Sequence, residues 1–241
     1  MAASERGPAW VFGGSGVVGS AVVKELTQRG FECRFSWHHN DRAARSLESA
    51  CGAHGFHFAA ERLAEVDAWV EHSVREWGVP RAFVYAIGVS ANKRLAELDI
   101  AEFEQAMRVN VTAPFALLHA LSPHIEKAGT GLDAVLIGAL DRGQSLPLPV
   151  HFAASQGALS TLTMSLAREL GPLGVRVNQL ALGVLEGGLS RTLSDDLVQR
   201  YLKFSALRRR GSAEEVARAA AWLLCENTYL TGRVVPVNGG I

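Results

Sequence analysis

The chain has 241 residues, 48% of them hydrophobic, which suits one large domain with a sizeable core. Its 24 basic and 24 acidic residues cancel, so no charge surplus favours nucleic acid or an anionic membrane. Cys33, Cys51 and Cys225 form neither a metal-ligand spacing nor a disulfide framework, which fits a reducing, cytoplasmic setting. We expect neither a signal peptide nor a membrane-spanning segment, because no apolar run has the required length and position.

Apolar runs of strand length alternate with longer amphipathic stretches. Strands are predicted at 9–12, 32–37, 56–59, 82–87, 134–139, 176–181 and 234–237. Helices are predicted at 20–29, 42–53, 65–77, 100–127 with interruptions near Pro114 and Pro123, 153–170, 195–203 and 214–224. Nearly all-apolar strands that alternate with helices predict a parallel sheet covered on both faces. We therefore expect an α/β fold with one Rossmann-type, doubly wound sheet of about seven strands, in a single dinucleotide-binding domain spanning 1–241.

A glycine-rich loop joins the first predicted strand to the first helix. Within it, Gly14, Gly16 and Gly19 match the G-x-G-x-x-G spacing. In this position the glycines let backbone N–H groups approach a pyrophosphate at the positive end of a helix. A tight turn without a ligand would use the same glycines. The functional interpretation is that a dinucleotide binds at Gly13, Gly14, Ser15, Gly16, Val18 and Gly19.

Four later segments follow in a recognisable order. They are Arg108-Val109-Asn110-Val111-Thr112, Val175-Arg176-Val177-Asn178, the stretch 207–217 and the stretch 229–240. Together with the glycine loop they resemble the short-chain dehydrogenase/reductase family over almost the whole chain, and most of all its 3-oxoacyl carrier-protein reductases. The resemblance implies that family's fold. It leaves the activity open, because most of these motifs are structural.

The resemblance places the family's catalytic Asn, Ser, Tyr and Lys at Asn110, Ala139, Phe152 and Gln156. In the family the Tyr donates a proton to the developing alkoxide, the Ser hydrogen-bonds the carbonyl, and the Lys lowers the Tyr pKa and holds the ribose. The Asn supports a water relay. An alanine methyl, a phenyl ring and a neutral amide cannot replace the Ser, Tyr and Lys. The resemblance therefore implies an oxidoreductase frame without its acid catalyst.

Other departures concern the cofactor. Val17 stands where the family usually has glycine, and Tyr85-Ala86-Ile87-Gly88 replaces its Asn-Asn-Ala-Gly. Leu182 replaces the Pro of its Pro-Gly after the sixth strand, and its usual Thr is missing around 186–187. We expect cofactor binding to be weakened rather than lost, with further contacts from Ala86, Gly88, Gly183 and Leu185.

The end of the second predicted strand bears on cofactor choice. The segment 36–40 lacks the acidic residue that binds a free ribose 2′-hydroxyl in NAD-preferring proteins. Its aromatic-basic-x-Asn order, Trp37-His38-His39-Asn40, resembles that of NADP-using reductases, and Arg42 follows closely. NADP(H), bound with the help of Trp37, His38 and Asn40, is therefore the expected cofactor. Trp37 could instead contact a partner.

Two residues are candidates for a replacement acid. His151 precedes Phe152, and Asp141 follows Ala139 by two positions, so both could lie near the mouth of the site. The plainer interpretations are a partly exposed loop histidine and a turn cap. Lys93 is expected to face water, and Ser155 to pack or cap. We expect no metal site: His38 and His39 would point apart on a strand, and His54 and His57 lack a carboxylate companion.

Three hypotheses follow. The first is a reductase-like subunit of fatty-acid or polyketide metabolism, non-catalytic or dependent on a partner. It would form a homo-oligomer, or a hetero-oligomer with an active homologue, and an acyl carrier protein is a further candidate partner. The second is an atypical NADPH-dependent or redox-neutral enzyme that acts on an apolar, polyketide-like substrate, with a different proton donor or one supplied by the substrate. The third, an ordinary reductase with a displaced motif, is disfavoured because none of Tyr85, Tyr201 and Tyr229 has Lys four residues later.

Overall fold

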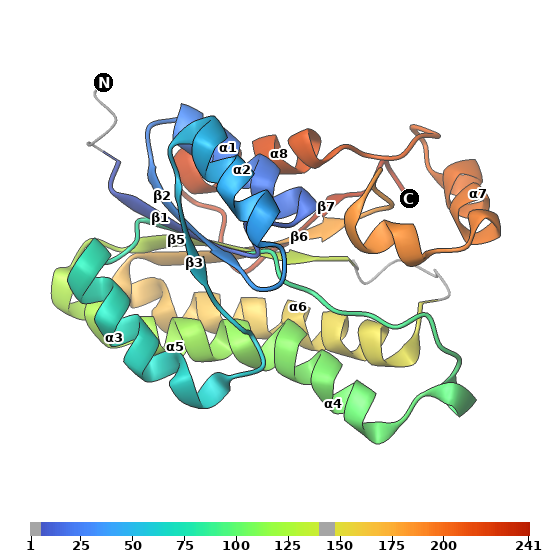
Figure 1. The fold of residues 1–241 in the computed structure, drawn as a ribbon, viewed down its shortest axis with the longest axis horizontal. Coiled ribbons are helices and arrows are strands. Elements are labelled where there is room, and N and C mark those ends of the chain that lie inside the picture. Colours follow the sequence, from blue (N-terminus) through green and yellow to red (C-terminus); the bar gives the residue numbers. More distant parts are fainter. Residues whose placement is uncertain (1–5, 140–147) are drawn as a thin grey trace.

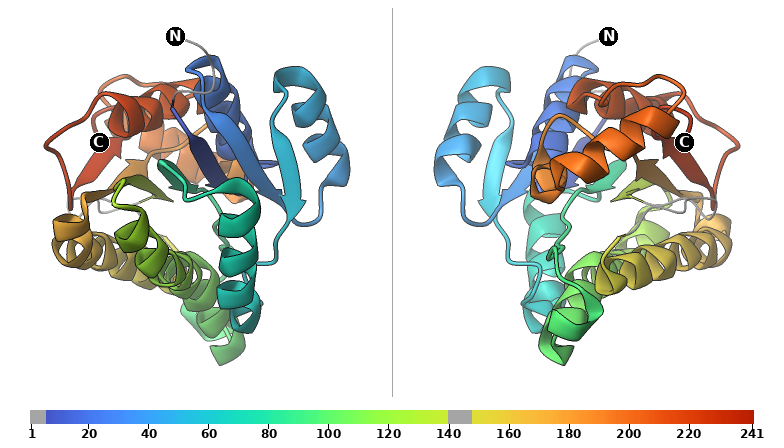
Figure 2. Two further views of the ribbon diagram at one scale, coloured as in Figure 1. Left: turned by 90° about the vertical axis from the view of Figure 1, so that its left-hand side faces the viewer. Right: turned by 90° about the vertical axis from the view of Figure 1, so that its right-hand side faces the viewer.

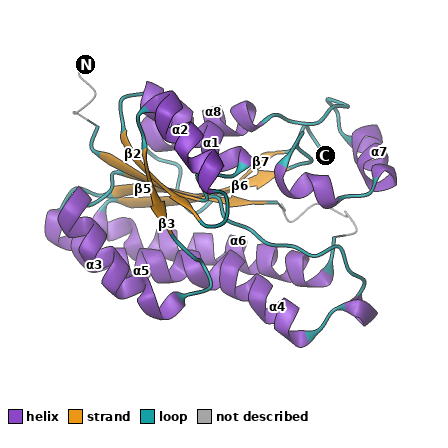
Figure 3. Cartoon of the chain, in the orientation of Figure 1, coloured by secondary structure: helices purple, strands orange, loops and turns teal. Residues whose placement is uncertain are grey.

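The computed structural model describes residues 6–139 and 148–241 and contains a parallel sheet with the strand order β3-β2-β1-β4-β5-β6-β7. The sheet runs through the middle of the molecule (Figure 3). The predicted doubly wound sheet of about seven strands is confirmed. Its strands are β1 (Pro8–Phe12), β2 (Glu32–Trp37), β3 (His54–His57), β4 (Ala82–Tyr85), β5 (Leu132–Gly138), β6 (Val175–Leu182) and β7 (Val234–Val237).

Helices cover both faces of the sheet, so the molecule has three layers (Figures 1 and 2). One face carries α1 (Val17–Gln28), α2 (Asp41–Cys51) and α8 (Ala213–Cys225). The other carries α3 (Val66–Trp77), α4 (Ile100–Met107), α5 (Ala113–Ala128) and α6 (Val150–Leu170). The remaining helix, α7 (Asp195–Phe204), lies beyond the carboxyl ends of the strands, close to the C-terminus (Figure 1).

Side chains that alternate along each strand build two separate cores. On β4, Ala82 and Val84 join the core under α1 and α8, while Phe83 and Tyr85 join the core against α3 and α5. Successive Cβ atoms of a strand point to opposite faces, and both faces are covered here, so a central strand is apolar throughout. This is why the short apolar runs of the sequence predicted strands correctly.

The long helix predicted at 100–127 is divided at a different place. A π-helical turn, Arg108–Thr112, separates α4 from α5, and Pro114 stands in the first turn of α5. Pro123 does not interrupt α5. Its ring nitrogen has no hydrogen for the carbonyl of His119, and the hydroxyl of Ser122 donates to that carbonyl instead, at 2.8 Å.

Several predicted boundaries are wrong. The first helix begins at Val17 rather than at 20, and the fifth strand at Leu132 rather than at 134. The third strand is His54–His57 rather than 56–59, because the edge strand is defined by pairing with β2 and not by its most apolar residues. The fourth strand ends at Tyr85. The helix predicted at 153–170 begins at Val150, which places His151 and Phe152 on its first turn. Within 6–139 and 148–241, no helix is long and apolar enough to cross a membrane.

The strand order reverses between β1 and β4, since β2 and β3 lie on one side of β1 and β4 to β7 on the other. In open α/β sheets such a reversal leaves a crevice at the carboxyl ends of the strands. The glycine loop follows β1 and therefore opens onto this crevice. Because the strands are parallel, β4, β5 and β6 end at the same edge of the sheet.

Candidate functional site

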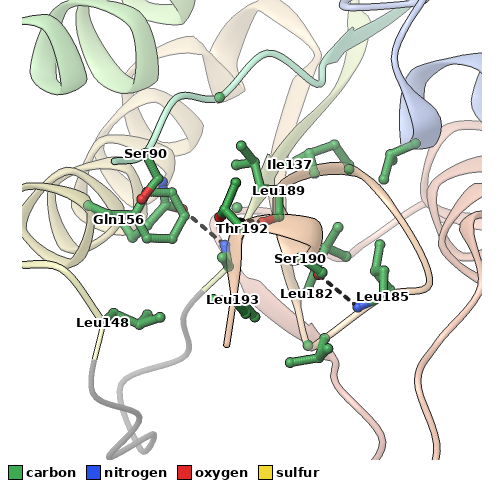
Figure 4. A pocket seen from close by; sticks show the side chains of 18 of the residues that line it. Ser90, Ile137, Leu148, Gln156, Leu182, Leu185, Leu189, Ser190, Thr192 and Leu193 are labelled. Carbon is green, nitrogen blue, oxygen red and sulfur yellow. Dashed lines mark hydrogen bonds between the residues drawn. The ribbon is translucent and has the colours of Figure 1, made fainter. Parts of the chain in front are cut away.

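A cavity of about 370 Å³ lies at the carboxyl ends of the central strands. Its walls come from the glycine loop, the segments after β4, β5 and β6, the start of α6, and α7. In Figure 4, Ser90 and Gln156 lie on one side of the cavity, and Ser190 and Leu185 on the other. Leucine and other apolar side chains make up most of the wall, so the cavity is suited to an apolar ligand.

The glycines of the loop are required by close approach of the backbone. Gly13 has a φ of +84°, a conformation that side-chain-bearing residues rarely adopt. A Cβ atom at Gly19 would collide with the carbonyl oxygen of Gly13, and one at Gly14 would collide with Phe35. Gly16 is the N-cap residue of α1 and lines the cavity with Val18. The loop therefore has the compact backbone that places the N-terminus of α1 at the cavity.

Ser36 anchors this loop to β2, a role that the sequence analysis missed. Its hydroxyl accepts a hydrogen bond from the backbone N–H of Gly13 at 2.7 Å, and its carbonyl accepts one from the N–H of Ser15 at 3.4 Å. Ser36 is buried. A serine between the aromatic residues Phe35 and Trp37 was the available signal. The backbone N–H of Ser15 is thus directed at β2.

Val17 narrows the cavity beside the loop. A Cβ atom added at Gly187, in the segment after β6, would lie 3.3 Å from both methyl carbons of Val17. Both residues line the cavity. The side chain of Val17 thus extends from the glycine loop to the opposite wall of the cavity. A glycine at position 17 would leave that space open.

Trp37 is the last residue of β2, His38 and Asn40 follow it, and none of the three lines the cavity. The rings of His38 and His39 stack with centroids 3.7 Å apart, so the expectation that they point apart is wrong. The reason is that β2 ends at Trp37 and both histidines lie outside the strand. Partial burial, and then His39, lower the pKa of His38. Asn40 caps α2: its side-chain oxygen accepts a hydrogen bond from the N–H of Ala43 at 3.0 Å.

Asn110 fastens the segment after β4 to the helices. Its side-chain oxygen accepts a hydrogen bond from the N–H of Val89 at 2.9 Å. Its NH₂ group donates to the carbonyl of Val89 at 3.0 Å and to the hydroxyl of Ser155 at 2.9 Å. The hydroxyl of Ser155 donates to the carbonyl of Phe152 at 2.8 Å. Asn110 is 2% exposed and sits in the π-helical turn, where it satisfies backbone groups. Ala86 and Gly88 of the same segment line the cavity.

The three positions predicted to have lost the family's catalytic side chains meet in the cavity wall. Ala139 follows β5, while Phe152 and Gln156 are one turn apart on α6, and all three line the cavity. The side-chain oxygen of Gln156 accepts a hydrogen bond from the backbone N–H of Ala139 at 2.9 Å. Phe152 is 6% exposed and offers only carbon atoms. Neither the ring nor the engaged amide can protonate an alkoxide.

His151 lies elsewhere than expected. It is 2% exposed rather than part of an exposed loop, because α6 begins one residue earlier. Its Nε2 atom accepts a hydrogen bond from the N–H of Ala91 at 3.0 Å, and it does not line the cavity. Asp141 lies outside the described residues. Lys93 forms an ion pair with Glu102 at 2.6 Å, which raises the pKa of Lys93, and it does not line the cavity.

The segment after β6 supplies Gly183 and Leu185. The N–H of Gly183 donates to the carbonyl of Val237 at 3.0 Å, and the N–H of Leu185 donates to the hydroxyl of Ser190 at 3.0 Å. A Cβ atom at Gly183 would collide with the hydroxyl of Tyr201 on α7. Tyr201 lines the cavity. It was missed as a cavity residue because nothing in the local sequence indicates where α7 packs.

Metal ligation has no support in 6–139 and 148–241, where no three His, Cys, Asp or Glu residues form a cluster that could hold an ion. The buried tyrosines are engaged with backbone oxygens: Tyr85 donates to the carbonyl of Val109 at 2.6 Å, and Tyr201 donates to that of Asn238. The arrangement offers a compact glycine turn, an apolar cavity and few groups able to exchange a proton.

The family model described as enoyl-(acyl carrier protein) reductase matches residues 15–241. The chain is 28% identical over 236 residues to the 3-oxoacyl-[acyl-carrier-protein] reductase FabG of Salmonella typhimurium, covering 97% of this chain and 96% of the relative. It is 27% identical over 233 residues to the cyclic-di-GMP-binding biofilm dispersal mediator protein of Escherichia coli, covering 95% and 94%.

Solved structures agree with this fold. A dehydrogenase/reductase from Sinorhizobium meliloti superposes with a TM-score of 0.86 at 25% identity, covering 97% of this chain and 94% of the other. A blue fluorescent protein from a metagenomic library, solved in complex with NADPH, also gives 0.86 at 24% identity, covering 97% of both chains. At that identity the second likeness concerns the fold alone.

Proposed function

Because the chain belongs to the short-chain dehydrogenase/reductase family, we propose that it is a reductase-like subunit that binds NADP(H) and an apolar ligand without ordinary hydride transfer. The observation that carries this proposal is the cavity wall formed by Ala139, Phe152 and Gln156. The side-chain oxygen of Gln156 already accepts a hydrogen bond from the backbone N–H of Ala139. The family resemblance puts the acid, its activator and its hydroxyl partner at these positions.

The described residues fit a dinucleotide. The compact turn at Gly13 to Gly19 leaves the space that Cβ atoms would fill, and it places the N-terminus of α1 against the cavity. Such a helix end favours a pyrophosphate. Trp37 and His38 would lie beside the adenosine ribose, with Arg42 as the nearby cation for a 2′-phosphate. Ala86, Gly88, Gly183 and Leu185 would border the nicotinamide half.

A bound NADPH would supply a hydride, but reduction of a ketone also needs a proton at the oxygen. Tyr201 also lines the cavity, but its hydroxyl already donates to the carbonyl of Asn238, and burial raises its pKa. Losing a general acid typically lowers a rate about 10²–10⁴-fold. Among the described residues, the groups expected to bind a dinucleotide are therefore better preserved than the groups able to donate a proton in ketone reduction.

We assign the chain to an oligomer, either of itself or with an active homologue. The apolar residues on α5 do not all pack inside the chain, and an exposed one is available for contact with a second subunit. Leu117 and Leu118 are fully buried in the chain's own core, whereas Phe115 is 43% exposed. The relative's name, an acyl-carrier-protein reductase, supports a carrier-borne acyl group as the ligand. We place this complex in the cytoplasm, with residues 1–241 as one domain.

A second candidate function is an atypical enzyme, and the open cavity of about 370 Å³ favours it. A purely structural subunit has no need of such a space. Among the described residues, His151 does not line the cavity and accepts a hydrogen bond from Ala91, so these residues support a substrate that carries its own acidic proton. A phenolic or β-dicarbonyl compound would meet that requirement.

NADPH titration by calorimetry, followed by NADPH oxidation assays, tests both candidates. We expect binding of NADPH, and no turnover of a simple β-ketoacyl thioester by the chain alone. Turnover of that thioester at about 1–10³ per second would contradict the proposal. Turnover of a phenolic ketone without turnover of the thioester would favour the second candidate. Failure to bind NADPH would contradict the first candidate and exclude the reductive form of the second.

A further inference from the structure

Tyr201 lies between two cavities. The first is the apolar cavity of about 370 Å³ described above. The second, of about 500 Å³, lies between α7, the start of α8 and the C-terminal segment. The two cavities share four lining residues, which are Gly183, Val184, Leu185 and Tyr201. Of these, Tyr201 has by far the largest side chain, so its ring is the main body of the shared wall.

The position of Tyr201 is fixed from both ends. The residue is 1% exposed and packs with Val184 and Val198. Its hydroxyl donates to the carbonyl of Asn238, beyond β7. A Cβ atom at Gly183 would lie 3.0 Å from the Cζ atom of Tyr201 and would overlap its hydroxyl. The missing side chain at Gly183 therefore lets the ring lie across the end of β6, in the wall that the two cavities share.

Both spaces have walls suited to hydrocarbon. The first is bordered by Phe152, Leu189 and Leu193, and the second by Val216, Pro236 and Val237. The charged groups of the second cavity neutralise one another, since Arg209 donates two hydrogen bonds to Glu215, at 2.9 and 2.5 Å. Neither cavity therefore demands a charged ligand along its apolar part.

We propose that Tyr201 sets the maximum length of the straight-chain acyl group that the first cavity accepts, and that the second cavity would take the far end of a longer chain once the ring is gone. This inference rests on the proposed binding of an apolar acyl ligand. In the intact protein the chain ends against the ring. Removing the ring joins the two cavities.

The hydroxyl of Tyr201 has a separate role. It ties α7 to the C-terminal segment through its bond to the carbonyl of Asn238, whereas the ring makes up most of the volume of the side chain. Tyr201→Phe keeps the ring and removes this bond, whereas Tyr201→Ala removes both. The two variants together separate the effect of the wall from the effect of a loosened α7.

The experiment is calorimetric titration of a homologous series of β-ketoacyl N-acetylcysteamine thioesters into the NADPH-saturated full chain and into both variants. In the wild type, each added methylene strengthens binding roughly fourfold until a cutoff length, beyond which affinity falls. We expect the cutoff to move to longer chains in Tyr201→Ala and to stay in place in Tyr201→Phe. Filling the second cavity again with Val237→Phe, in the Tyr201→Ala background, should restore the shorter cutoff.

A cutoff that is unchanged in a folded Tyr201→Ala protein, or that moves equally in Tyr201→Phe, would overturn this inference alone. If Tyr201→Ala does not fold, Tyr201→Leu replaces it, because leucine keeps apolar packing for α7 and still shortens the side chain. Should no thioester bind to any of the proteins, the inference and the proposed apolar ligand both fail.

Discussion

The side-chain oxygen of Gln156 accepts a hydrogen bond from the backbone N–H of Ala139, at 2.9 Å. The residue at the family's lysine position is therefore joined to the residue at its serine position, across α6 and the end of β5. A lysine could not accept this bond, because its ammonium group only donates. The substitution at 156 is thus integrated into the surrounding structure.

Restoring the missing groups together should restore catalysis. We expect Ala139→Ser/Phe152→Tyr/Gln156→Lys to raise NADPH-dependent reduction of a β-ketoacyl thioester by about 10²–10⁴-fold over the wild type. Each single substitution should stay near background, because the members of a catalytic unit are not additive. The double variant that retains Phe152 is the matched control. A rise of similar size in that control would show that the tyrosine is not the acid.

Arg42 should favour NADPH over NADH. It is exposed on α2 and, within the described ranges, has no ion-pair partner. Its neighbour Arg45 is bound to Asp41 at 2.6 Å and serves as the control. We expect Arg42→Ala to weaken NADPH binding by about tenfold or more and to leave NADH binding nearly unchanged, since a hydrogen bond to a charged group contributes about 1.5–3 kcal/mol. Calorimetric titration of NADPH and NADH into Arg42→Ala and into the control variant Arg45→Ala measures this. An equal loss for NADH would rule out a phosphate contact.

Shortening Val17 should strengthen cofactor binding. Its methyl groups extend from the glycine loop to Gly187, across the part of the cavity beside the N-terminus of α1. We expect NADPH to bind more tightly to both Val17→Ala and Val17→Gly. The glycine variant should also unfold at a lower temperature, because glycine weakens a helix by about 1 kcal/mol relative to alanine. Fluorescence titration and thermal melts test the two effects separately, and weaker NADPH binding in the alanine variant would contradict the steric role.

We expect Asn110→Ala to destabilise the fold, and this effect does not depend on any catalytic role of Asn110. The substitution leaves the N–H and carbonyl of Val89 without their partner, and an unsatisfied buried group costs about 1–3 kcal/mol. Asn92 is the control, because it is exposed and its single bond, to the carbonyl of Thr192, is 3.3 Å long. Its alanine variant should change the free energy of unfolding by less than about 0.5 kcal/mol. Equal urea midpoints for the two variants would contradict this assignment.

Acid should weaken the link between the segment after α7 and α8. Arg209, and then the N–H of Ser212, lower the pKa of Glu215 from 4.5 to about 2. Because the folded pKa lies below the unfolded one, the contribution of Glu215 to stability is present above pH 4.5 and is lost as the pH falls towards about 2. Glu215→Gln should flatten thermal stability over that window. Glu214→Gln, on the same turn of α8, should leave the profile unchanged, and equal flattening in both would contradict the assignment.

Local sequence signals were sufficient where local chemistry decides the structure. The glycines at 13, 14 and 19 predicted a compact strand-to-helix turn because side chains would collide there. Local sequence signals were less successful in predicting the strand at the edge of the sheet. His54 to His57 forms a strand through backbone pairing with β2, although the neighbouring residues Phe58 and Ala59 are more buried. Edge strands are selected by pairing, which hydropathy does not record.

The sequence by itself determined the parallel sheet and the glycine turn, since these depend on residue type and on short-range spacing, and its resemblance to the family predicts the replacement of three catalytic side chains. Only the tertiary structure decided how the replacements are used. In the folded chain Gln156 is hydrogen-bonded to Ala139, His151 is hydrogen-bonded to Ala91, and Tyr201 lies between two cavities. Each of these contacts joins segments at least 17 residues apart. Their geometry follows from the packing of helices on the sheet, and a side chain's neighbours across such packing are not encoded in its own stretch of sequence.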